Sequence, residues 1–150
     1  MRRAIFLGLL SSLAIAGVAV GGVRPAAGTK FVGKTSQGKK ISLQVVKGGG
    51  LKMTFIEIAT CNKGPKRQNR ARFDQDKPHV KSDGNFDYRK TYYNLPPTNG
   101  IAESFTDRQH IHGIIGDRRH LTGYFEEDLI GSKGLKCQVR MTFNAHRVKS

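Results

Sequence analysis

Three histidines in the C-terminal half are the clearest candidates for metal chemistry. His110 and His112 are separated by one residue, so on an extended strand their side chains project from the same face. His120 follows a turn and could lie across a hairpin from them, with Asp117 adding an oxygen. Imidazole nitrogens are common ligands of zinc and copper. These residues could instead be ordinary solvated histidines on an outward-facing strand. A metal-binding protein or metalloenzyme is therefore kept only as the alternative function. We expect no resident cofactor.

A second group of candidates consists of basic side chains that could bind anions. The chain has 26 Lys and Arg against 11 Asp and Glu, a formal charge of +15. Closely spaced cations attract phosphate, sulfate and carboxylate groups. The alternative is a solvated surface that only keeps the protein soluble. The predicted anion-binding residues are Lys63, Lys66, Arg67, Arg70, Arg72, Arg118, Arg119 and Arg140.

The acidic residues do not form a recognisable catalytic set. Glu126, Glu127 and Asp128 are consecutive and lie beside a turn, which favours a solvated run, and Glu103 stands alone. The sequence has no G-x-S-x-G nucleophile motif, no P-loop and no G-x-G-x-x-G dinucleotide motif. We therefore expect a protein that is not an enzyme.

The N-terminal segment predicts export. Arg2 and Arg3 precede an uncharged stretch from residue 4 to residue 23, and small residues at 26–28 offer a cleavage site. The stretch of 20 residues would be about 30 Å long as a helix, which is enough to span a bilayer. Residues 1–28 are thus a signal peptide or an uncleaved membrane anchor, and residues 29–150 form a single domain.

Only two cysteines are present, and both lie beyond the export segment. Cys61 and Cys137 are 76 residues apart. An even number of cysteines outside the cytoplasm favours an intramolecular disulfide. Two buried thiols or an intermolecular link are the alternatives.

Period-2 patterns dominate the rest of the chain and predict strands. The clearest is 137–145, where Cys137, Val139, Met141, Phe143 and Ala145 alternate with polar residues. Such alternation is typical of an antiparallel sheet with one face in water. About eight short strands separated by turn signals predict an all-β domain, either a small antiparallel β-sandwich or a barrel.

Two segments interrupt this pattern. Leu51, Met53 and Phe55 occupy odd positions, whereas Ile56 and Ile58 occupy even positions and would face the other side of the same strand. This change of parity predicts either a bulge or a strand that is covered on both faces. Residues 62–84 are rich in charge, Gly and Pro and are interpreted as one long loop.

The segment Phe31-Val-Gly-Lys-Thr-Ser-Gln-Gly-Lys-Lys-Ile-Ser-Leu, with its G-x-T-S-Q-G turn, resembles the opening of a group of small exported bacterial β proteins of actinobacterial type. Thr122-Gly123-Tyr124-Phe125 and the Cys137–Phe143 strand resemble later parts of the same proteins. The resemblance covers most of residues 29–147. It implies export and an all-β fold, and it carries no activity.

Together these observations predict an exported, non-catalytic β domain of the cell envelope or extracellular space. We expect it to bind anionic envelope polymers or lipids through its basic loop, and not to bind nucleic acid. We expect a monomer, whose contact with a membrane would be limited to an uncleaved N-terminal segment.

Overall fold

The computed structural model describes residues 24–98 and 101–148. Most of the predicted signal or anchor segment, residues 1–28, therefore lies outside the described residues. Within the described part of the chain, no helix is long and apolar enough to cross a membrane.

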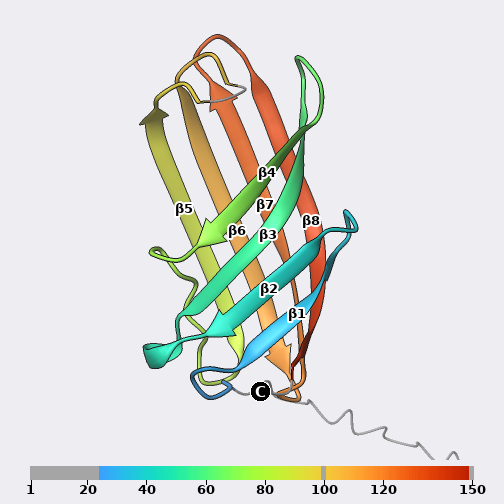
Figure 1. The fold of residues 1–150 in the computed structure, drawn as a ribbon. Helices are drawn as coiled ribbons and strands as arrows, with labels where there is room; N and C mark the ends of the chain where they lie inside the picture. Colours follow the sequence, from blue (N-terminus) through green and yellow to red (C-terminus); the bar gives the residue numbers. More distant parts are fainter. Residues whose placement is uncertain (1–23, 99–100, 149–150) are drawn as a thin grey trace, which may run out of the picture.

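Eight antiparallel strands dominate the described chain (Figure 1). A single short 3₁₀ turn, η1, spans Lys47–Gly49. The strands are β1 (Lys30–Thr35), β2 (Lys40–Val45), β3 (Leu51–Cys61), β4 (Arg67–Phe73), β5 (Asn85–Leu95), β6 (Phe105–Gly116), β7 (His120–Gly131) and β8 (Lys136–Arg147).

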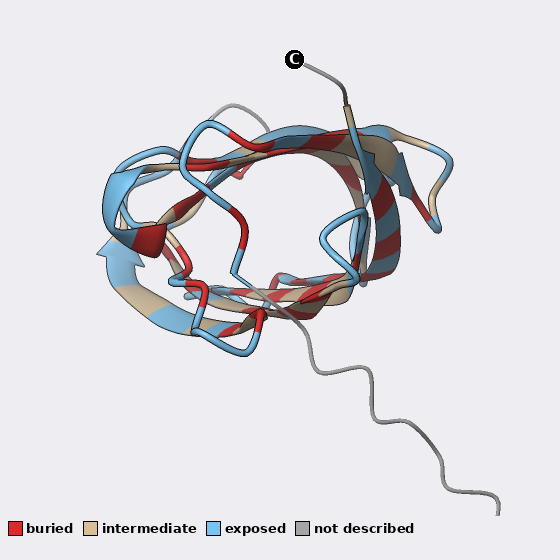
Figure 2. Cartoon of the chain, turned by 90° about the horizontal axis from the view of Figure 1, so that it is seen from below, coloured by how far each residue is buried: buried red, intermediate tan, exposed pale blue. Residues whose placement is uncertain are grey.

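The strands form one sheet in the order β4-β3-β2-β1-β8-β7-β6-β5, and the sheet curls round into a barrel (Figure 2). The predicted all-β class is thus confirmed, and of the two predicted architectures the protein adopts the barrel. A curled sheet buries one face of every strand, which explains why the period-2 patterns are so regular.

The barrel interior is filled by the inward-facing residues of each strand. In β8, the five residues at alternate positions from Cys137 to Ala145 are buried and those between them are exposed, as the sequence predicts. The largest fully buried side chains are Phe31, Phe55, Phe86, Phe125, Ile41, Leu43, Leu51, Met53, Ile111, Ile115, Leu121 and Val45.

The turn between β1 and β2 fastens this short hairpin to its neighbours. The Gln37 amide accepts a hydrogen bond from the Ile58 N–H at 2.7 Å and donates one to the Ile58 carbonyl at 2.9 Å. The Ser36 N–H donates to the Thr142 carbonyl at 2.8 Å. The pairing between β2 and β3 begins at Ile41 opposite Phe55, so Ile58 has no backbone partner on β2. The side chain of Gln37 takes the place of that partner.

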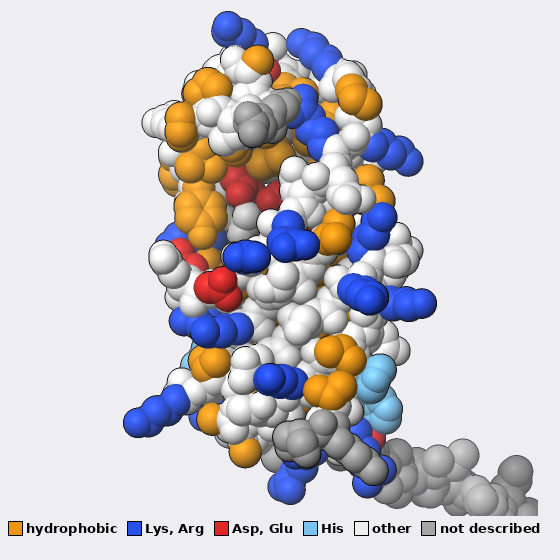
Figure 3. Space-filling model, viewed as in Figure 1, with side chains coloured by type: hydrophobic (Ala, Val, Ile, Leu, Met, Phe, Trp, Pro, Cys, Tyr) orange, Lys and Arg blue, Asp and Glu red, His pale blue; other side chains and the backbone are white. Residues whose placement is uncertain are grey.

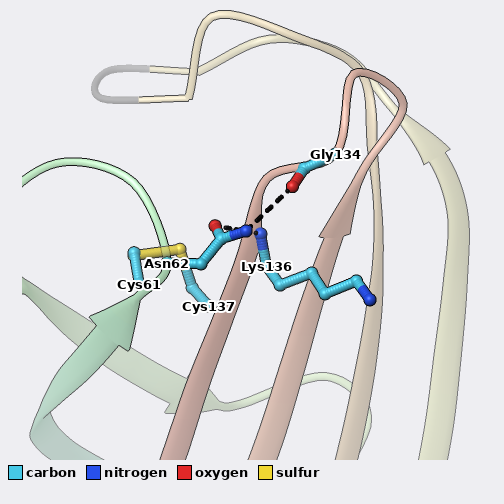
Figure 4. Close-up of a disulfide and its surroundings, with 5 residues drawn as sticks. All are labelled: Cys61, Asn62, Gly134, Lys136 and Cys137. Carbon is cyan, nitrogen blue, oxygen red and sulfur yellow. Dashed lines mark hydrogen bonds between the residues drawn. A yellow bond between two sulfur atoms is a disulfide. The ribbon is translucent and has the colours of Figure 1, made fainter.

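Beyond this hairpin β3 pairs directly with β8, and a disulfide joins the two strands there. Cys61 is directly opposite Cys137, and their sulfur atoms are bonded. Next to it, the Asn62 side chain donates to the Gly134 carbonyl at 3.0 Å and accepts from the Lys136 N–H at 2.9 Å (Figure 4). The predicted intramolecular disulfide is confirmed.

Two details of the sequence interpretation are wrong. Residues 62–84 are not one loop, because β4 occupies Arg67–Phe73. β3 contains no bulge, because its register with β4 runs unbroken from Met53 to Ala59. Ile56 and Ile58 lie on the outer face of β3, where both are partly buried, so the second predicted alternative, a strand covered on both faces, is closer to the structure.

The described chain packs on the barrel from its first residues. Pro25 is buried, the Arg24 N–H donates to the Ser82 carbonyl at 3.3 Å, and the Gly28 N–H donates to the Val45 carbonyl at 2.8 Å. The contacts of the barrel thus include residues on the N-terminal side of the predicted boundary at residue 28.

The two edge strands of the sheet, β4 and β5, meet at a seam. No backbone pairing joins them among the described residues. Side chains connect the two sides instead: the Tyr92 hydroxyl donates to Asp76 at 3.2 Å, and Lys90 lies 3.4 Å from the same carboxylate. Side chains rather than backbone hydrogen bonds therefore close the barrel at the seam. Where these side chains do not meet, the surface can open between the two strands.

Candidate functional site

The predicted histidines do not converge. His110 and His112 lie on the outer face of β6, as their spacing predicts. His110 is 2.8 Å from Asp87 on β5, and the His112 ring stacks on Tyr124 with centroids 5.5 Å apart. Both imidazoles thus have partners on neighbouring strands.

His120 lies too far along β7 to join them. It is opposite Gly116 on β6, whereas His112 is opposite Tyr124. Four residues of strand separate these two levels, which is about 13 Å. His120 instead contacts Asp117 of its own turn at 3.1 Å. Among the described residues, no three or more His, Cys, Asp or Glu side chains are arranged to hold a metal ion.

The predicted anion-binding residues occupy several parts of the surface. Lys63 and Lys66 lie in the β3–β4 turn at one end of the barrel, whereas Arg118 and Arg119 lie in the β6–β7 turn at the other end (Figure 1). Arg140 on β8 pairs with Asp128 at 2.7 Å. These cations therefore do not form one surface.

The remaining three predicted cations lie on β4 at the seam. Arg70 and Arg72 project from its outer face and are exposed. Arg67 points the other way, and its Nε atom is buried without a hydrogen-bond partner. The three arginines are thus divided between the two faces of one strand.

A cluster of three acidic side chains occupies the barrel interior. We call Glu57 on β3, Asp107 on β6 and Glu127 on β7 the carboxyl cluster. Their exposed fractions are 3 %, 8 % and 5 %. Each occupies an inward position of its strand, two residues from a buried phenylalanine. Acidic side chains are almost never so deeply buried unless they are paired.

One amide holds two members of the cluster in place. The Gln109 Nε2 atom donates to Asp107 Oδ2 at 2.7 Å and to Glu127 Oε1 at 3.2 Å. Gln109 is directly opposite Glu127 in the β6–β7 register, so the pairing of the two strands brings these groups together. Glu57 is on β3, close enough to Glu127 for its negative charge to raise the pKa of Glu127.

Each member of the carboxyl cluster keeps one oxygen free. Glu57 Oε2, Asp107 Oδ1 and Glu127 Oε2 are buried and have no hydrogen-bond partner. None of the ion pairs among the described residues includes a member of the cluster. The cluster thus has acceptor capacity, and no basic side chain in the described part of the chain forms an ion pair with it.

Burial raises the pKa of all three carboxyl groups above the ordinary values, because the charged form loses its hydration. The increase is largest for Glu127, where negative charge on Glu57 and Asp107 adds to the effect of burial. Gln109 acts in the opposite direction, since its hydrogen bonds favour the ionised forms of Asp107 and Glu127. The cluster therefore retains a proton at neutral pH.

The carboxyl cluster lines a pocket at the seam. A pocket of about 630 Å³, which we call the seam pocket, lies between β4 and β5 and is lined by all three carboxyl groups. A second pocket of about 510 Å³ reaches Asp107 and Glu127 past Arg67. Figure 3 shows the acidic side chains within a hollow of the surface that is bordered by basic and apolar side chains.

Aromatic rings lie beside the carboxyl cluster. Phe55 and Phe125 pack edge to face with centroids 5.0 Å apart, and Phe73 is 5.9 Å from Tyr88 and 6.1 Å from Phe125. Burial raises the pKa of the Tyr88 hydroxyl, which has no hydrogen-bond partner. The seam pocket is thus polar at the carboxyl cluster, and Phe73, Tyr92 and Leu95 add apolar surface to its wall.

Known proteins offer no guide to this site. No family model, no curated protein and no solved structure matches the chain. The function must therefore be argued from the site itself.

Sequence reasoning missed Glu57, Asp107 and Gln109, and it placed Glu127 in a solvated run. The signal that could have found the acids is parity. Glu127 has the same parity as the buried Phe125 and Leu129, and Glu57 has the same parity as Phe55 and Ala59. An acidic residue at an inward position of a strand predicts either a buried pair or a site.

The arrangement has two chemical capacities. Ionised carboxylates without a partner can bind a cation or a strong hydrogen-bond donor, and such charge-assisted bonds are stronger than neutral ones. A carboxyl group that stays protonated at neutral pH can also donate a hydrogen bond or a proton. Both capacities require a molecule that fits through the seam.

Proposed function

We propose that this protein binds a small organic molecule inside its barrel and that the molecule enters through the seam pocket. A single observation carries the proposal: three buried carboxyl groups, each with one oxygen that has no hydrogen-bond partner, line a pocket between β4 and β5. Ligand sites are typically concave, largely apolar and furnished with a few convergent polar groups. In the seam pocket the carboxyl cluster supplies the convergent polar groups, and Phe73, Tyr92 and Leu95 supply apolar surface.

The energetic argument supports a ligand over a purely structural role for the cluster. A buried polar group that lacks a hydrogen bond costs about 1–3 kcal/mol. The three free oxygens would therefore lower stability, and apolar side chains at the same positions would avoid that cost. Buried carboxyl groups that destabilise the fold in this way are expected where they bind or react with a ligand.

The proposal also includes a location outside the cytoplasm. The charged N-terminus, the uncharged stretch and the small residues at 26–28 are typical of an export signal. The disulfide between Cys61 and Cys137 is consistent with an oxidising compartment. An exported barrel of this kind would capture or carry a molecule present in the envelope or the medium.

Ligand-observed NMR with a library of compact cationic, neutral and anionic molecules tests the proposed function. Ala71 on β4 faces the seam pocket, so Ala71→Trp should fill the opening and abolish binding. The matched control is Thr60→Trp, which adds the same ring to the exposed outer face of β3. Leu95→Trp blocks the pocket from the β5 side if Ala71→Trp does not fold.

The expected result is a set of binders that Ala71→Trp loses and Thr60→Trp retains. A library in which every binder tolerates the blocking substitutions, or in which nothing binds, would contradict the proposed function.

We also propose a second function, the attraction of anionic envelope polymers, because Arg70 and Arg72 are exposed beside the seam and form no ion pair among the described residues. Retention on a sulfated polysaccharide column measures it. Replacing both arginines by Gln should lower the eluting salt concentration more than the same change at Arg118 and Arg119, which lie in the β6–β7 turn. Equal shifts would show only the effect of net charge.

A further inference from the structure

The carboxyl cluster indicates the chemical class of the ligand. We infer that the seam pocket binds an organic cation that donates N–H hydrogen bonds, such as an amidinium, guanidinium or primary ammonium group, attached to a flat apolar body. This inference rests on the proposed function, because it names the ligand of the same pocket.

The lack of ion pairs at the carboxyl cluster favours a positively charged ligand. The chain has 26 basic residues and 11 acidic ones, so basic partners are plentiful. None of them forms an ion pair with Glu57, Asp107 or Glu127 among the described residues. Buried carboxylates are normally paired, and removing one partner of a buried pair is strongly destabilising. A ligand that brings its own positive charge supplies the missing partner.

The three carboxyl oxygens without partners favour a ligand that donates hydrogen bonds. The free atoms are Glu57 Oε2, Asp107 Oδ1 and Glu127 Oε2, and an ionised carboxylate only accepts hydrogen bonds. Once the cluster has given up its proton, these oxygens need donors, and a ligand that displaces the proton has to bring its own N–H groups. A primary ammonium has three N–H donors and a guanidinium has five, whereas a quaternary ammonium has the charge but no donor. The free oxygens thus favour N–H cations over other cations.

The arrangement of the carboxyl groups favours an organic cation over a bare metal ion. Metal ligands must converge to about 2.0–2.6 Å from one point. Within residues 24–98 and 101–148, no three acidic, histidine or cysteine side chains do so. Gln109 instead holds Asp107 and Glu127 on two different hydrogen bonds, and Glu57 comes from another strand, β3. Donors spread over several atoms suit carboxyl groups placed in this way.

The apolar wall indicates the rest of the ligand. Phe73, Tyr92 and Leu95 line the seam pocket together with the carboxyl cluster. A planar ring attached to the cation would pack on these side chains while the N–H groups reach the carboxyl oxygens. With a volume of about 630 Å³, the pocket has room for a ring and its cationic group.

Calorimetric titration of the oxidised protein near pH 7 with four matched probes tests the inference. Benzamidine and benzylamine carry an N–H cation, benzyltrimethylammonium has the charge without donors, and benzyl alcohol is neutral. The first two should bind at least about tenfold more tightly than the last two, because charge-assisted hydrogen bonds contribute about 1.5–3 kcal/mol each. Cation binding should also release protons, visible as a dependence of the measured heat on buffer.

Variants connect the selectivity to the cluster. Glu127→Gln should weaken benzamidine binding by about tenfold or more and leave benzyl alcohol unchanged. The matched control is Glu126→Gln, one residue away on the outer face of β7, which should change neither. Asp107→Asn repeats the test if Glu127→Gln does not fold.

Three results would overturn the inference: no binding of either N–H cation, equal binding of benzyl alcohol or benzyltrimethylammonium, or the same loss in Glu126→Gln as in Glu127→Gln. These results are separate from failure of the proposed function. If the NMR library yields only neutral ligands that Ala71→Trp excludes, the pocket binds small molecules but the assigned ligand class is wrong.

Discussion

The buried carboxyl of Glu127 makes a sharp prediction about stability and pH. Burial, together with the negative charges of Glu57 and Asp107, raises the pKa of Glu127 to about 9, well above the value near 4.5 that it has in the unfolded chain. Between these two values the folded protein holds a proton that the unfolded chain has released. Stability must therefore fall as the pH rises through this window.

The magnitude follows from linkage. One proton held only by the folded state changes the free energy of unfolding by about 1.4 kcal/mol per pH unit. From pH 5 to pH 7 the loss is about 3 kcal/mol for Glu127 alone, and Glu57 and Asp107 act in the same direction because their pKa values are also raised. A loss of this size is a large part of the stability of a small domain.

The perturbation that isolates the effect is Glu127→Gln, which keeps the shape and removes the titration. Urea unfolding of the oxidised protein at pH 5, 6, 7 and 8, at constant ionic strength, gives the free energy of unfolding for each variant. Relative to wild type, the Gln variant should gain about 3 kcal/mol between pH 5 and pH 7. Glu126→Gln is the control, and its difference from wild type should stay within about 0.5 kcal/mol across the range.

The comparison between variants removes the contributions that the other titratable groups of the chain make to the pH dependence. If the stability of the wild type rises from pH 5 to pH 8, or if Glu127→Gln leaves the slope unchanged, then Glu127 is not a buried acid and the reasoning about the cluster fails.

Three further predictions concern the scaffold. Replacing Cys61 and Cys137 together by Ala should lower the free energy of unfolding by up to about 4–5 kcal/mol, the loop-closure value for 76 residues, measured by urea unfolding against the oxidised wild type; no loss would contradict it. Gly33→Ala should destabilise the barrel by about 1–3 kcal/mol or prevent folding, because its Cβ would lie 1.9 Å from the Asn144 carbonyl oxygen; a wild-type melting temperature would refute this. Gln37→Ala should cost about 1–3 kcal/mol, since it removes two hydrogen bonds to the β3 backbone, and faster amide exchange at Ile58 is the specific check.

The strand pattern was predictable because burial in a barrel is periodic. The alternation from Cys137 to Ala145 identifies β8 directly, and the turn at 116–118 corresponds to the observed β6–β7 connection, where Asp117 and Arg118 have positive φ. Two cysteines in a domain that was expected to be exported were enough to predict the disulfide.

The carboxyl cluster was not predicted because its residues break the pattern that defines strands. Glu57 puts a polar residue at an inward position of β3, and the apolar Ile56 and Ile58 then resemble a change of parity. β4 was missed for a related reason. It is an edge strand at the seam, and only Phe73 among its residues is buried. Polar inward positions were therefore interpreted as irregularity or as loop.

The histidines show the opposite limit. Spacing alone places His110 and His112 on one face of β6, but the position of His120 depends on the register between β6 and β7. The turn fixes that register, and a shift of even one residue would move every side chain to the other face. Sequence could therefore propose a three-histidine group without being able to test it.

The disulfide between Cys61 and Cys137 has a consequence for the mouth of the barrel. The segment from 61 to 137 is a covalent ring, and it contains β4, β5, β6 and β7. Both margins of the seam belong to this ring. The proposed entry of a ligand through the seam would therefore take place within a covalently closed segment of the chain. In the oxidised protein both margins of the seam thus belong to one covalently closed segment.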